Sequence, residues 1–397
     1  AEELATLMAA EAGKPLRDAR GEVQRARLTL RTAAEEALRI GGETMPLDVA
    51  AAGEGRFSIS RRVPVGVVAG VTPFNFPLNL VLHKLAPALA SGNAVIIKAS
   101  PRAPLTALRL GELALEQGLP AGAVNVLAGG AEPVEQLLAD ERVALFSFTG
   151  SAAVGWGLKA RAGRKRVVLE LGGNAANLVH RDADLELAAA RLSAGAFAYA
   201  GQSCISVQRV LAHRAIYAEL REQLIERAQR LRLGDPADEA TEVGPMITGE
   251  AAERAFTWMQ EAVAAGARAA CGMRREGSFV WPTVLEGVPE GAAISREEAF
   301  APVLLLEPYD QPEEALRRAN ASRYGLQAGV FTRDLEFALE AFRRLEVGAV
   351  LINEASNWRM DPMPYGGVKD SGFGREGIRA SIAEMTELRL LILKPSS

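Results

Sequence analysis

The chain has 397 residues, of which 49% are hydrophobic and 24% are charged, and its formal net charge is −4. This length predicts two or three domains with sizeable cores, and the mixed charges give no overall basic field that would favour nucleic acid. The two cysteines cannot form a disulfide framework and suit a reducing cytosol, and no long uncharged apolar run indicates a membrane, so a cytoplasmic protein is expected.

The first half of the chain alternates apolar runs with amphipathic segments, which is typical of a parallel sheet covered by helices. Residues 1–40 predict two helices broken around 13–15, and the segment 46–62 predicts a hairpin that projects from the body. Further strands are expected at 66–71, 94–98, 124–127 and 144–149, and further helices at 78–89, 105–117, 133–139 and 151–160.

The same alternation begins again after a strand at 167–171, which predicts a second α/β domain. Its expected strands are 175–179, 208–213 and 348–353, and its expected helices are 184–198, 215–231 and 251–265. The end of the chain, "TELRLLILKPSS", predicts a strand that leaves the body.

One glycine pattern, "GFGREG" at residues 372–377, matches the dinucleotide fingerprint G-x-G-x-x-G. The fingerprint needs a preceding strand, a following helix and an acid about 20 residues further on. Here the preceding "PYGGVKDS" is typical of a loop, and the chain ends where the acid is needed. A glycine-rich turn is therefore the preferred interpretation.

Two earlier strand ends are better candidates for a phosphate site. In "LFSFTGSAAVG", Ser151 can cap a helix and Gly150 permits close backbone approach, so the helix N–H groups could bind an anion. In "NAVIIKASP" a strand ends in Lys98 and is followed by Ser100. Ligands of open α/β sheets gather at the carboxyl ends of strands, so the two stretches together predict a dinucleotide cleft. Alone, each is also consistent with a simple helix cap or a surface lysine.

Three other side chains are candidates for chemistry. Asn75 lies between two phenylalanines and two prolines in "TPFNFP", which suits a rigid oxyanion donor, although a turn-forming Asn is the alternative. Glu170 closes an apolar strand in "VLELGGN", where desolvation raises the pKa toward that of a general base; the alternative is an exposed acid. Cys204 lies in the small, polar loop "YAGQSCIS", which can present a thiol and stabilise a thiolate through backbone N–H groups. A buried structural cysteine is the alternative, and it is the interpretation kept for Cys271.

Together these stretches resemble the aldehyde dehydrogenase superfamily. The matching segments occur in the family's order and span nearly the whole chain: "TPFNFP", "HKLAPALASGNAVIIKASP", "FTGSAAVG", "LELGGN", "GQSC", "EEAFAPV" and "PYGGVKDSGFGRE". The resemblance implies an α/β fold with two Rossmann-like parallel-sheet domains and a small β oligomerisation arm. The cofactor-binding domain would comprise residues 1–45 and 63–171, the catalytic domain 172–380, and the arm 46–62 and 381–397. A homodimer or homotetramer is implied.

The resemblance also implies oxidation of an aldehyde to the carboxylic acid, with hydride transfer to NADP or NAD and no metal. Cys204 would attack the carbonyl to form a thiohemiacetal, while Asn75 and the backbone N–H of Cys204 would hold the oxyanion. Loss of the hydride would leave a thioester, and Glu170 would activate water to release the acid. Lys84 matches an active-site lysine of the family.

Other site residues follow from the same resemblance. Glu298 matches the acid that holds the nicotinamide ribose, Phe300 lies beside the ring, and Phe74 and Phe76 would flank the substrate channel. The full set of implied cofactor-binding positions is Thr72, Lys98, Ser100, Gly150, Ser151, Gly172, Glu298 and Phe300.

The sequence departs from the family pattern in several places. Members normally carry several dozen more residues before Ala1, so part of the helical cover of the cofactor domain is expected to be missing. Pro101 replaces the acid by which many members select NAD, so NADP is expected to be accepted. Asn174 replaces a common Lys, which resembles members that act on lactaldehyde or glyceraldehyde derivatives. Arg359 could pair with a carboxylate, phosphate or sulfonate of the substrate, or with Asp361 or another acid.

Two other functions compete with this interpretation. A CoA-acylating relative would release the thioester to CoA and would not need a water-activating carboxylate, so Glu170 argues against it. A non-catalytic family member would act as a structural or binding protein, but it would not need Cys204, Glu170 and Asn75 together.

Overall fold

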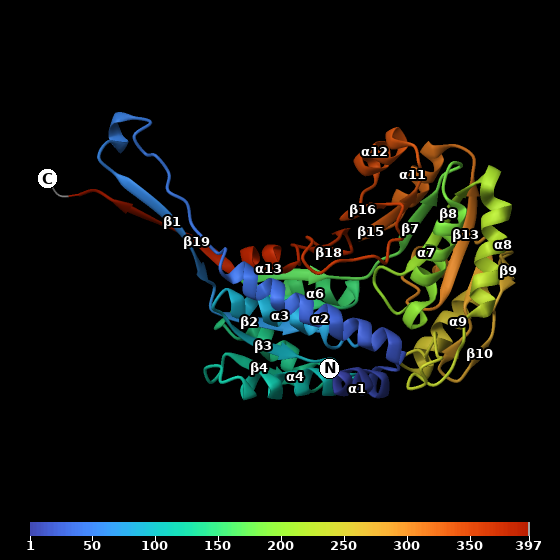
Figure 1. The fold of residues 1–397 in the computed structure, drawn as a ribbon, viewed down its shortest axis with the longest axis horizontal. Helices are drawn as coiled ribbons and strands as arrows, with labels where there is room; N and C mark the ends of the chain where they lie inside the picture. The colour runs from blue at the N-terminus through green and yellow to red at the C-terminus, as the bar shows by residue number, and fades with distance from the viewer. Residues whose placement is uncertain (396–397) are drawn as a thin grey trace.

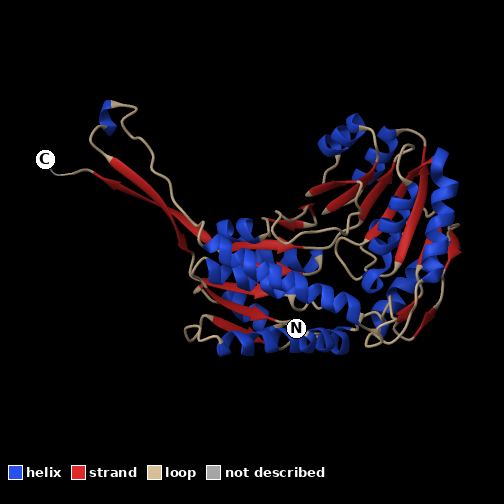
Figure 2. Ribbon diagram, viewed as in Figure 1, coloured by secondary structure: helices blue, strands red, loops and turns tan. Residues whose placement is uncertain are grey.

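Two separate sheets with helices packed on their faces form the body of the molecule, and a two-stranded arm projects from it (Figure 1, Figure 2). The computed structural model describes residues 1–395. None of the helices in this part of the chain combines the length and the hydropathy needed to cross a membrane. The predicted fold class, with two Rossmann-like α/β units and a small β arm, is confirmed.

The first sheet has the strand order β18-β6-β5-β2-β3-β4. Five strands are parallel, and β18 joins the edge of β6 in the antiparallel direction. The strands are β2 (Val67–Val71), β3 (Ala94–Lys98), β4 (Val124–Leu127), β5 (Val143–Thr149), β6 (Arg166–Glu170) and β18 (Gly372–Phe373). The helices of this unit are α1 (Glu2–Ala12), α2 (Leu16–Ala37), α3 (Asn79–Ala90), α4 (Leu105–Glu116), α5 (Glu132–Ala139), α6 (Ala152–Arg161) and α13 (Ile378–Glu384).

Helices cover both faces of this sheet because alternate side chains along a strand point to opposite sides. Val68 and Leu145 pack in the cluster formed with α1 to α4, whereas Ala69 and Phe146 pack in the cluster formed with α5 and α6. Burial on both faces explains why these strands are continuously apolar.

The second sheet has the order β16-β15-β7-β8-β13-β12-β9, and all of its strands except β9 pair in parallel. Its strands are β7 (Ala175–Val179), β8 (Val207–His213), β9 (Arg268–Cys271), β12 (Thr283–Glu286), β13 (Val303–Tyr309), β15 (Gln327–Phe331) and β16 (Ala349–Ile352). Its helices are α7 (Leu185–Phe197), α8 (Arg214–Arg230), α9 (Gly249–Ala264), α10 (Ala293–Arg296), α11 (Pro312–Asn320) and α12 (Leu335–Arg344). Two small ribbons pair β10 (Arg275–Glu276) with β11 (Phe279–Val280) and β14 (Tyr324–Gly325) with β17 (Val368–Lys369).

Most predicted elements are confirmed to within two residues at their ends, and β3, β4 and β7 match residue for residue. The exceptions are α2, which ends at Ala37 rather than near residue 40, and the final strand, which ends at Leu393; residues 396 and 397 of the predicted strand lie outside the described residues. The prediction misses several elements between α9 and β16, among them β12, β13, β15 and α12. The segment 372–377 is not a dinucleotide loop, because its first two residues form β18, an antiparallel edge strand.

The arm corrects the prediction of a hairpin at 46–62. The strand β1 (Phe57–Pro64) pairs with β19 (Thr386–Leu393), more than 300 residues away, in register from Phe57↔Leu393 to Pro64↔Thr386. Between the end of α2 and the start of β1, the chain forms only a short 3₁₀ turn at Ala51–Gly53 and one bridge, Thr44↔Ile59. Residues 46–55 lack the alternation that a second hairpin strand needs, so the partner comes from the other end of the chain.

A buried ion pair fixes the first two helices to the segments that carry Asn75 and Cys204. Lys14 and Glu22 form a salt bridge with side chains that are 1% and 0% exposed. The other carboxylate oxygen of Glu22 accepts hydrogen bonds from the N–H groups of Leu78 and Asn79, at the start of α3. The ammonium of Lys14 lies 3.8 Å from the ring centroid of Phe76 and 4.5 Å from that of Tyr199. Phe76 follows Asn75, and Tyr199 precedes the Cys204 loop.

Candidate active site

One cavity, of about 400 Å³, collects the residues predicted to carry chemistry. Asn75, Glu170 and Cys204 all line it, although they come from segments far apart in the sequence. The other predicted residues that line it are Phe74, Gly150, Ser151, Gly172, Glu298 and Phe300. Phe76 does not belong to its lining, because it packs instead against Tyr199 and the ammonium of Lys14.

The glycines after β6 allow the chain to pass close to the cysteine. Glu170 is the last residue of β6, and its carbonyl accepts a hydrogen bond of 3.0 Å from Gly150 N–H. A Cβ atom at Gly173 would lie 2.3 Å from the carbonyl oxygen of Cys204, and one at Gly172 would lie 2.4 Å from Glu298 Oε2. Only glycine permits both approaches, which is why "LGG" follows the strand.

The Cys204 sulfur lies 3.1 Å from the hydroxyl of Tyr365. Burial raises the pKa of the Cys204 thiol to about 12, with a further rise from the charges of Glu298 and Glu170 and an opposing effect of Tyr365 and Arg359. This rise in pKa opposes the predicted stabilisation of a thiolate by the loop N–H groups, which stays a prediction.

Glu170 confirms the expectation of a desolvated acid. The residue is 3% exposed, and neither carboxylate oxygen has a hydrogen-bond partner among the described residues. Burial, reinforced by the charge of Glu376, raises the pKa of Glu170 well above its usual value. A buried carboxyl group with free lone pairs can hold and activate a water molecule.

Asn75 is held by the loop that carries the cysteine. Its Nδ2 donates a hydrogen bond of 3.0 Å to the carbonyl of Gln202, two residues before Cys204. The side chain is buried, and its Oδ1 has no partner in residues 1–395. The amide is thus fixed in the lining of the cavity that Cys204 also lines, with one N–H still available as a donor.

Lys84 lies behind the cavity rather than in its wall. Its Nζ donates to Glu376 Oε1 at 2.7 Å and to Ser147 Oγ at 2.8 Å, and the side chain is fully buried. Burial alone would raise the pKa of Glu376, but the positive charges of Lys84, His83 and Arg359 lower it. Sequence reasoning placed Glu376 only in the decoy glycine pattern and missed this pair.

Arg359 is buried and incompletely paired. Its Nη2 lies 3.1 Å from His83 Nδ1 and 3.9 Å from Glu376 Oε2, and its Nε has no partner in the described chain. The guanidinium lies 3.6 Å from the ring centroid of Tyr365. The alternative was a salt bridge to Asp361 or another acid: Asp361 pairs with Arg25 and His83 instead, but the contact with Glu376 is a salt bridge to another acid.

The residues predicted to hold NAD(P) occupy two neighbouring places. Ser151 is the N-cap of α6 but makes no side-chain capping bond, so the first-turn N–H groups of Ala152 and Ala153 border the cavity without a cap. Lys98 is 4% exposed, and its Nζ forms no hydrogen bond or ion pair with residues 1–395. An uncapped helix N-terminus and an unpaired buried ammonium fit a dinucleotide with phosphate and ribose groups.

Thr72, Lys98 and Ser100 lie outside the cavity lining, at the carboxyl ends of the neighbouring strands β2 and β3. Thr72 N–H donates to the carbonyl of Lys98 at 3.1 Å, which holds the two strand ends together. Glu298 accepts a hydrogen bond of 3.1 Å from Gly173 N–H, and burial raises its pKa to about 7. The Phe300 ring packs edge-on against Phe74 at 6.0 Å.

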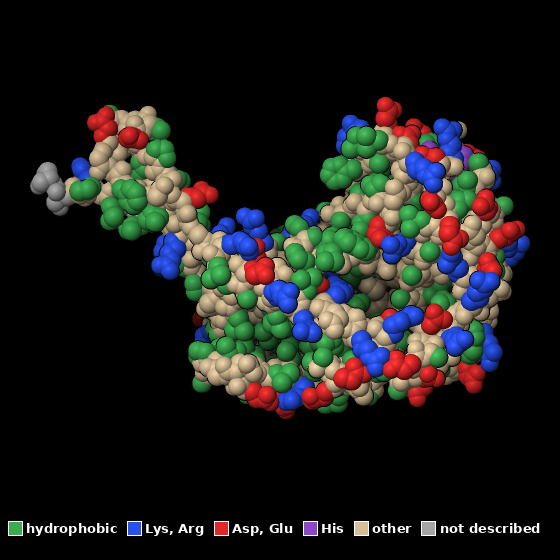
Figure 3. Space-filling model, in the orientation of Figure 1, with side chains coloured by type: hydrophobic (Ala, Val, Ile, Leu, Met, Phe, Trp, Pro, Cys, Tyr) green, Lys and Arg blue, Asp and Glu red, His purple; other side chains and the backbone are tan. Residues whose placement is uncertain are grey.

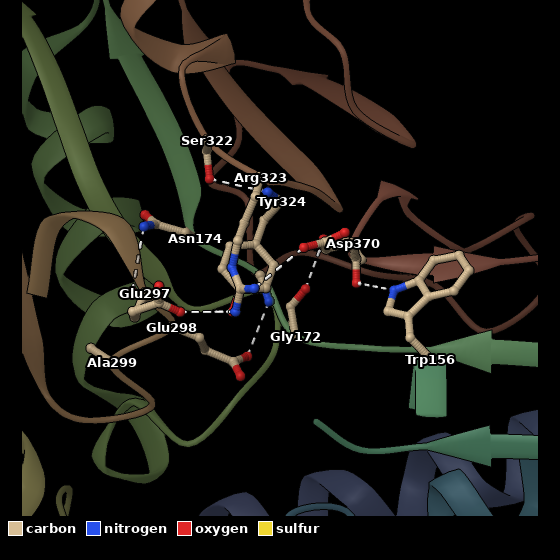
Figure 4. A network of polar contacts seen from close by, with 12 residues as sticks. Trp156, Gly172, Asn174, Glu297, Glu298, Ala299, Ser322, Arg323, Tyr324 and Asp370 are labelled. Carbon is tan, nitrogen blue, oxygen red and sulfur yellow. Dashed lines mark hydrogen bonds and ion pairs between the residues drawn. The ribbon is translucent and has the colours of Figure 1, made fainter. Parts of the chain in front are cut away.

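A polar network closes the rim of the cavity next to Glu298 (Figure 4). Arg323 Nη2 donates to Glu297 Oε2 at 2.9 Å and to the hydroxyl of Tyr324 at 2.8 Å, while Nη1 reaches Asp370 at 3.4 Å. The indole N–H of Trp156, on α6, donates to the carbonyl of Asp370 at 3.4 Å. This network joins α6 to the segments around the second sheet, and no motif in the sequence predicted it.

A cysteine that shares a cavity with an uncapped helix N-terminus and a desolvated carboxyl group is typical of oxidoreductases that work through a thioester. Residues 1–391 match the profile of the aldehyde dehydrogenase family. A 3-sulfolactaldehyde dehydrogenase of Priestia aryabhattai is 49% identical over 393 residues, which cover 99% of this chain and 82% of that protein.

Solved structures agree with this relationship. Aldehyde dehydrogenase 21 from Physcomitrella patens, in complex with the reaction product succinate, has a TM-score of 0.97 and 45% identity over 99% of this chain and 82% of that one. A glyceraldehyde-3-phosphate dehydrogenase of Methanocaldococcus jannaschii complexed with NADP has a TM-score of 0.95 and 40% identity over 99% and 86%. The chain belongs to the aldehyde dehydrogenase family, and its activity is NAD(P)-dependent oxidation of an aldehyde.

We expect the rate at which iodoacetamide alkylates Cys204 in the cofactor-free protein to keep rising with pH through about pH 9, because the thiolate is the nucleophile and burial raises the thiol pKa. Mass spectrometry of a Cys271→Ser variant, in which Cys204 is the only cysteine, measures this rate. A rate that levels off near neutral pH would show that the sulfur is already ionised.

Proposed function

We propose that this chain is an acid-forming enzyme for small aldehydes that carry an anionic group, with Cys204 as nucleophile, Asn75 as oxyanion donor and Glu170 as general base. The buried, incompletely paired Arg359 is the observation that carries the substrate class. The domain division at residues 171 and 172, the arm of 46–62 and 381–397, and a cytoplasmic location for a protein with free thiols belong to the same proposal.

In the first half-reaction the Cys204 thiol gives its proton to a water molecule of the cavity, and the thiolate attacks the aldehyde carbon. The carbonyl oxygen then becomes an oxyanion, and the free N–H of Asn75 and the backbone N–H of Cys204 would stabilise it. Donors of this kind contribute about 3 kcal/mol each to the transition state. The chemistry that NAD(P) supplies when bound is acceptance of a hydride from the thiohemiacetal carbon, which leaves a thioester on Cys204.

In the second half-reaction Glu170 takes a proton from water, and the resulting hydroxide attacks the thioester. Both carboxylate oxygens are free and buried, so a water between Glu170 and the sulfur would be its natural partner. Lys84 and Glu376 form an ion pair near Glu170; the charge of Glu376 raises the pKa of Glu170, whereas the charges of Arg359 and Lys84 limit the rise. A CoA-acylating enzyme would instead form acyl-CoA from added CoA, and this proposal expects none.

Lys98, the N-terminus of α6 and Glu298 would hold the cofactor through its phosphates and riboses. Pro101 places no carboxylate near the adenosine ribose, and Lys98 is an unpaired cation at that strand end. These features support NADP as an accepted cofactor, because nothing there repels a 2′-phosphate.

The ratio of kcat/KM for NADP to that for NAD tests this assignment. We expect NADP to be used at least comparably to NAD. A preference for NAD beyond about 100-fold, roughly 2.7 kcal/mol of transition-state free energy, would contradict it.

Arg359 supports an anionic substrate for two further reasons. Its guanidinium stacks on Tyr365, whose hydroxyl contacts Cys204, so a group bound at Arg359 would lie one aromatic ring from the sulfur. Relatives include enzymes named for 3-sulfolactaldehyde and for glyceraldehyde-3-phosphate, and one structure holds succinate. Sulfonate, phosphate and carboxylate all suit a planar guanidinium.

Replacing Arg359 with Ala should raise KM for an anionic aldehyde such as succinate semialdehyde by about 10- to 100-fold, because a charge-assisted hydrogen bond is lost. KM for neutral propanal should change little. Steady-state kinetics with both aldehydes measure this difference, and Arg343→Ala, on the exposed face of α12, is the matched control. An equal rise in KM for both aldehydes would refute the anion site.

The arm supports assembly into a homodimer or homotetramer. Along β19, Leu388, Leu390, Leu391, Ile392 and Leu393 are each 48–61% exposed. Ser58 and Ser60 of β1 are buried, but the apolar side chains of β19 are exposed, and hydrophobic side chains are prominent on the arm in Figure 3. A two-stranded ribbon is marginally stable in water, so a second copy of the chain would cover this surface.

We expect the double substitution Leu390→Asp and Ile392→Asp to convert the oligomer into a monomer, because charges would then be buried at the interface. Light scattering after size-exclusion chromatography measures the mass. Leu115→Asp, at an equally exposed apolar position on α4, should leave the mass unchanged. A wild-type protein that is already monomeric would contradict the role of the arm.

A further inference from the structure

Tyr365 places its hydroxyl on the reacting sulfur, and nothing in the sequence analysis assigned it a role. The hydroxyl oxygen lies 3.1 Å from Cys204 Sγ, and the residue is 4% exposed. We propose that Tyr365 is a catalytic residue that donates a hydrogen bond to the Cys204 thiolate, both when the thiolate forms and when it leaves the thioester. This inference rests on the proposed nucleophilic role of Cys204.

The sulfur is the hydrogen-bond partner of the Tyr365 hydroxyl. In residues 1–395 the hydroxyl has no other hydrogen-bond partner, so its position is not explained by a bond elsewhere. A phenylalanine ring would fill the same space without burying a hydroxyl, and burying a hydroxyl is unfavourable unless it is hydrogen-bonded. The sulfur is therefore the group that accounts for a tyrosine at this position.

The ring is held rigidly on all sides. The backbone N–H of Tyr365 donates to the carbonyl of Glu376 at 2.9 Å, and Glu376 N–H donates back at 2.7 Å. The ring packs with Ile205 and Leu326, and the Arg359 guanidinium covers it at 3.6 Å. A donor fixed in this way needs no reorganisation when charge develops on the sulfur.

The hydrogen bond between Tyr365 and Cys204 becomes stronger during the reaction, when the hydroxyl becomes the donor and the charged sulfur the acceptor. With a neutral thiol, either the S–H or the O–H group can donate. A thiolate can only accept, so the hydroxyl must then donate, and a hydrogen bond to a charged acceptor in a buried site is stronger. The proton stays on Tyr365 throughout, because burial holds the pKa of the phenol well above its usual value.

The groups around the sulfur oppose one another. Burial and the carboxyl groups of Glu170 and Glu298 disfavour the thiolate, whereas Tyr365 and Arg359 favour it. Burial raises the thiol pKa, so a donor that lowers it increases the thiolate fraction. A thiolate with a lower pKa is also a weaker nucleophile, but on a logarithmic scale this loss is only about half of the gain in thiolate fraction. The alkylation rate therefore increases overall.

The test compares Tyr365→Phe with wild type in the Cys271→Ser background, in the absence of cofactor and aldehyde. Loss of the donor should raise the thiol pKa by about one to two units and slow iodoacetamide alkylation of Cys204 about three- to tenfold at each pH. With NADP and aldehyde, kcat should fall by a similar factor, while KM for NADP stays unchanged.

Tyr217→Phe is the matched control, because Tyr217 donates its hydroxyl hydrogen bond to Glu286, which lies at the end of β12. It should leave both rates unchanged. If Tyr365→Phe does not fold, Tyr365→Met fills similar space without a donor and gives the same comparison.

Unchanged alkylation and kcat in Tyr365→Phe, or faster alkylation, would overturn the proposal, since the hydroxyl would then be neutral or would hold the thiol protonated. Failure of the proposed function is seen separately, as continued aldehyde oxidation by Cys204→Ser. The Tyr365 comparison uses alkylation alone and does not depend on turnover.

Discussion

In the proposed mechanism the Cys204 sulfur must ionise in a place where burial opposes ionisation. The other residues of the site therefore have to stabilise charge on the sulfur and on the reacting groups. Desolvation raises the pKa of the thiol to about 12, and two nearby carboxyl groups add to the rise. The same water-poor cavity strengthens every hydrogen bond that a developing charge can accept. Tyr365 can supply such a donor at the sulfur, and Asn75 lines the same cavity as Cys204. A site of this kind favours the charged states of the reaction through fixed dipoles rather than through water.

Charged side chains also lie behind the cavity. Glu170 is kept free of partners, whereas Glu376 just behind it is paired with Lys84 and lies near Arg359. Two buried carboxyl groups with different partners have pKa values shifted in opposite directions: that of Glu170 is raised, which suits a group that takes a proton from water, whereas that of Glu376 is lowered, which favours its ionised form. The Lys14–Glu22 pair then fixes the segments that hold Asn75 and Cys204 to the first two helices.

Local sequence signals were sufficient to predict those helices and strands that pack against elements close to them in the chain. The βα repeats of the first sheet and the strand ends at Lys98, Gly150 and Glu170 follow from apolar periodicity and strand order. Local signals in residues 46–62 do not identify a partner at the other end of the chain, so only the family resemblance, which put 46–62 and 381–397 in one arm, pointed to the pairing of β1 with β19. Tyr365 and Glu376 were missed for the same reason, because their roles depend on contacts with Cys204 and Lys84 and not on nearby sequence.

The most direct test of the central claim is the intact mass of the protein after rapid mixing with NADP and an aldehyde substrate. In Glu170→Gln the Cys204 thioester should accumulate, because no base activates water, and the protein mass should rise by that of the aldehyde less two hydrogens. The same mixture with Cys204→Ser as a second substitution should show no added mass. Accumulation of the reduced cofactor without any covalent adduct in Glu170→Gln, or an adduct that persists when Cys204 is replaced, would contradict catalysis through this sulfur.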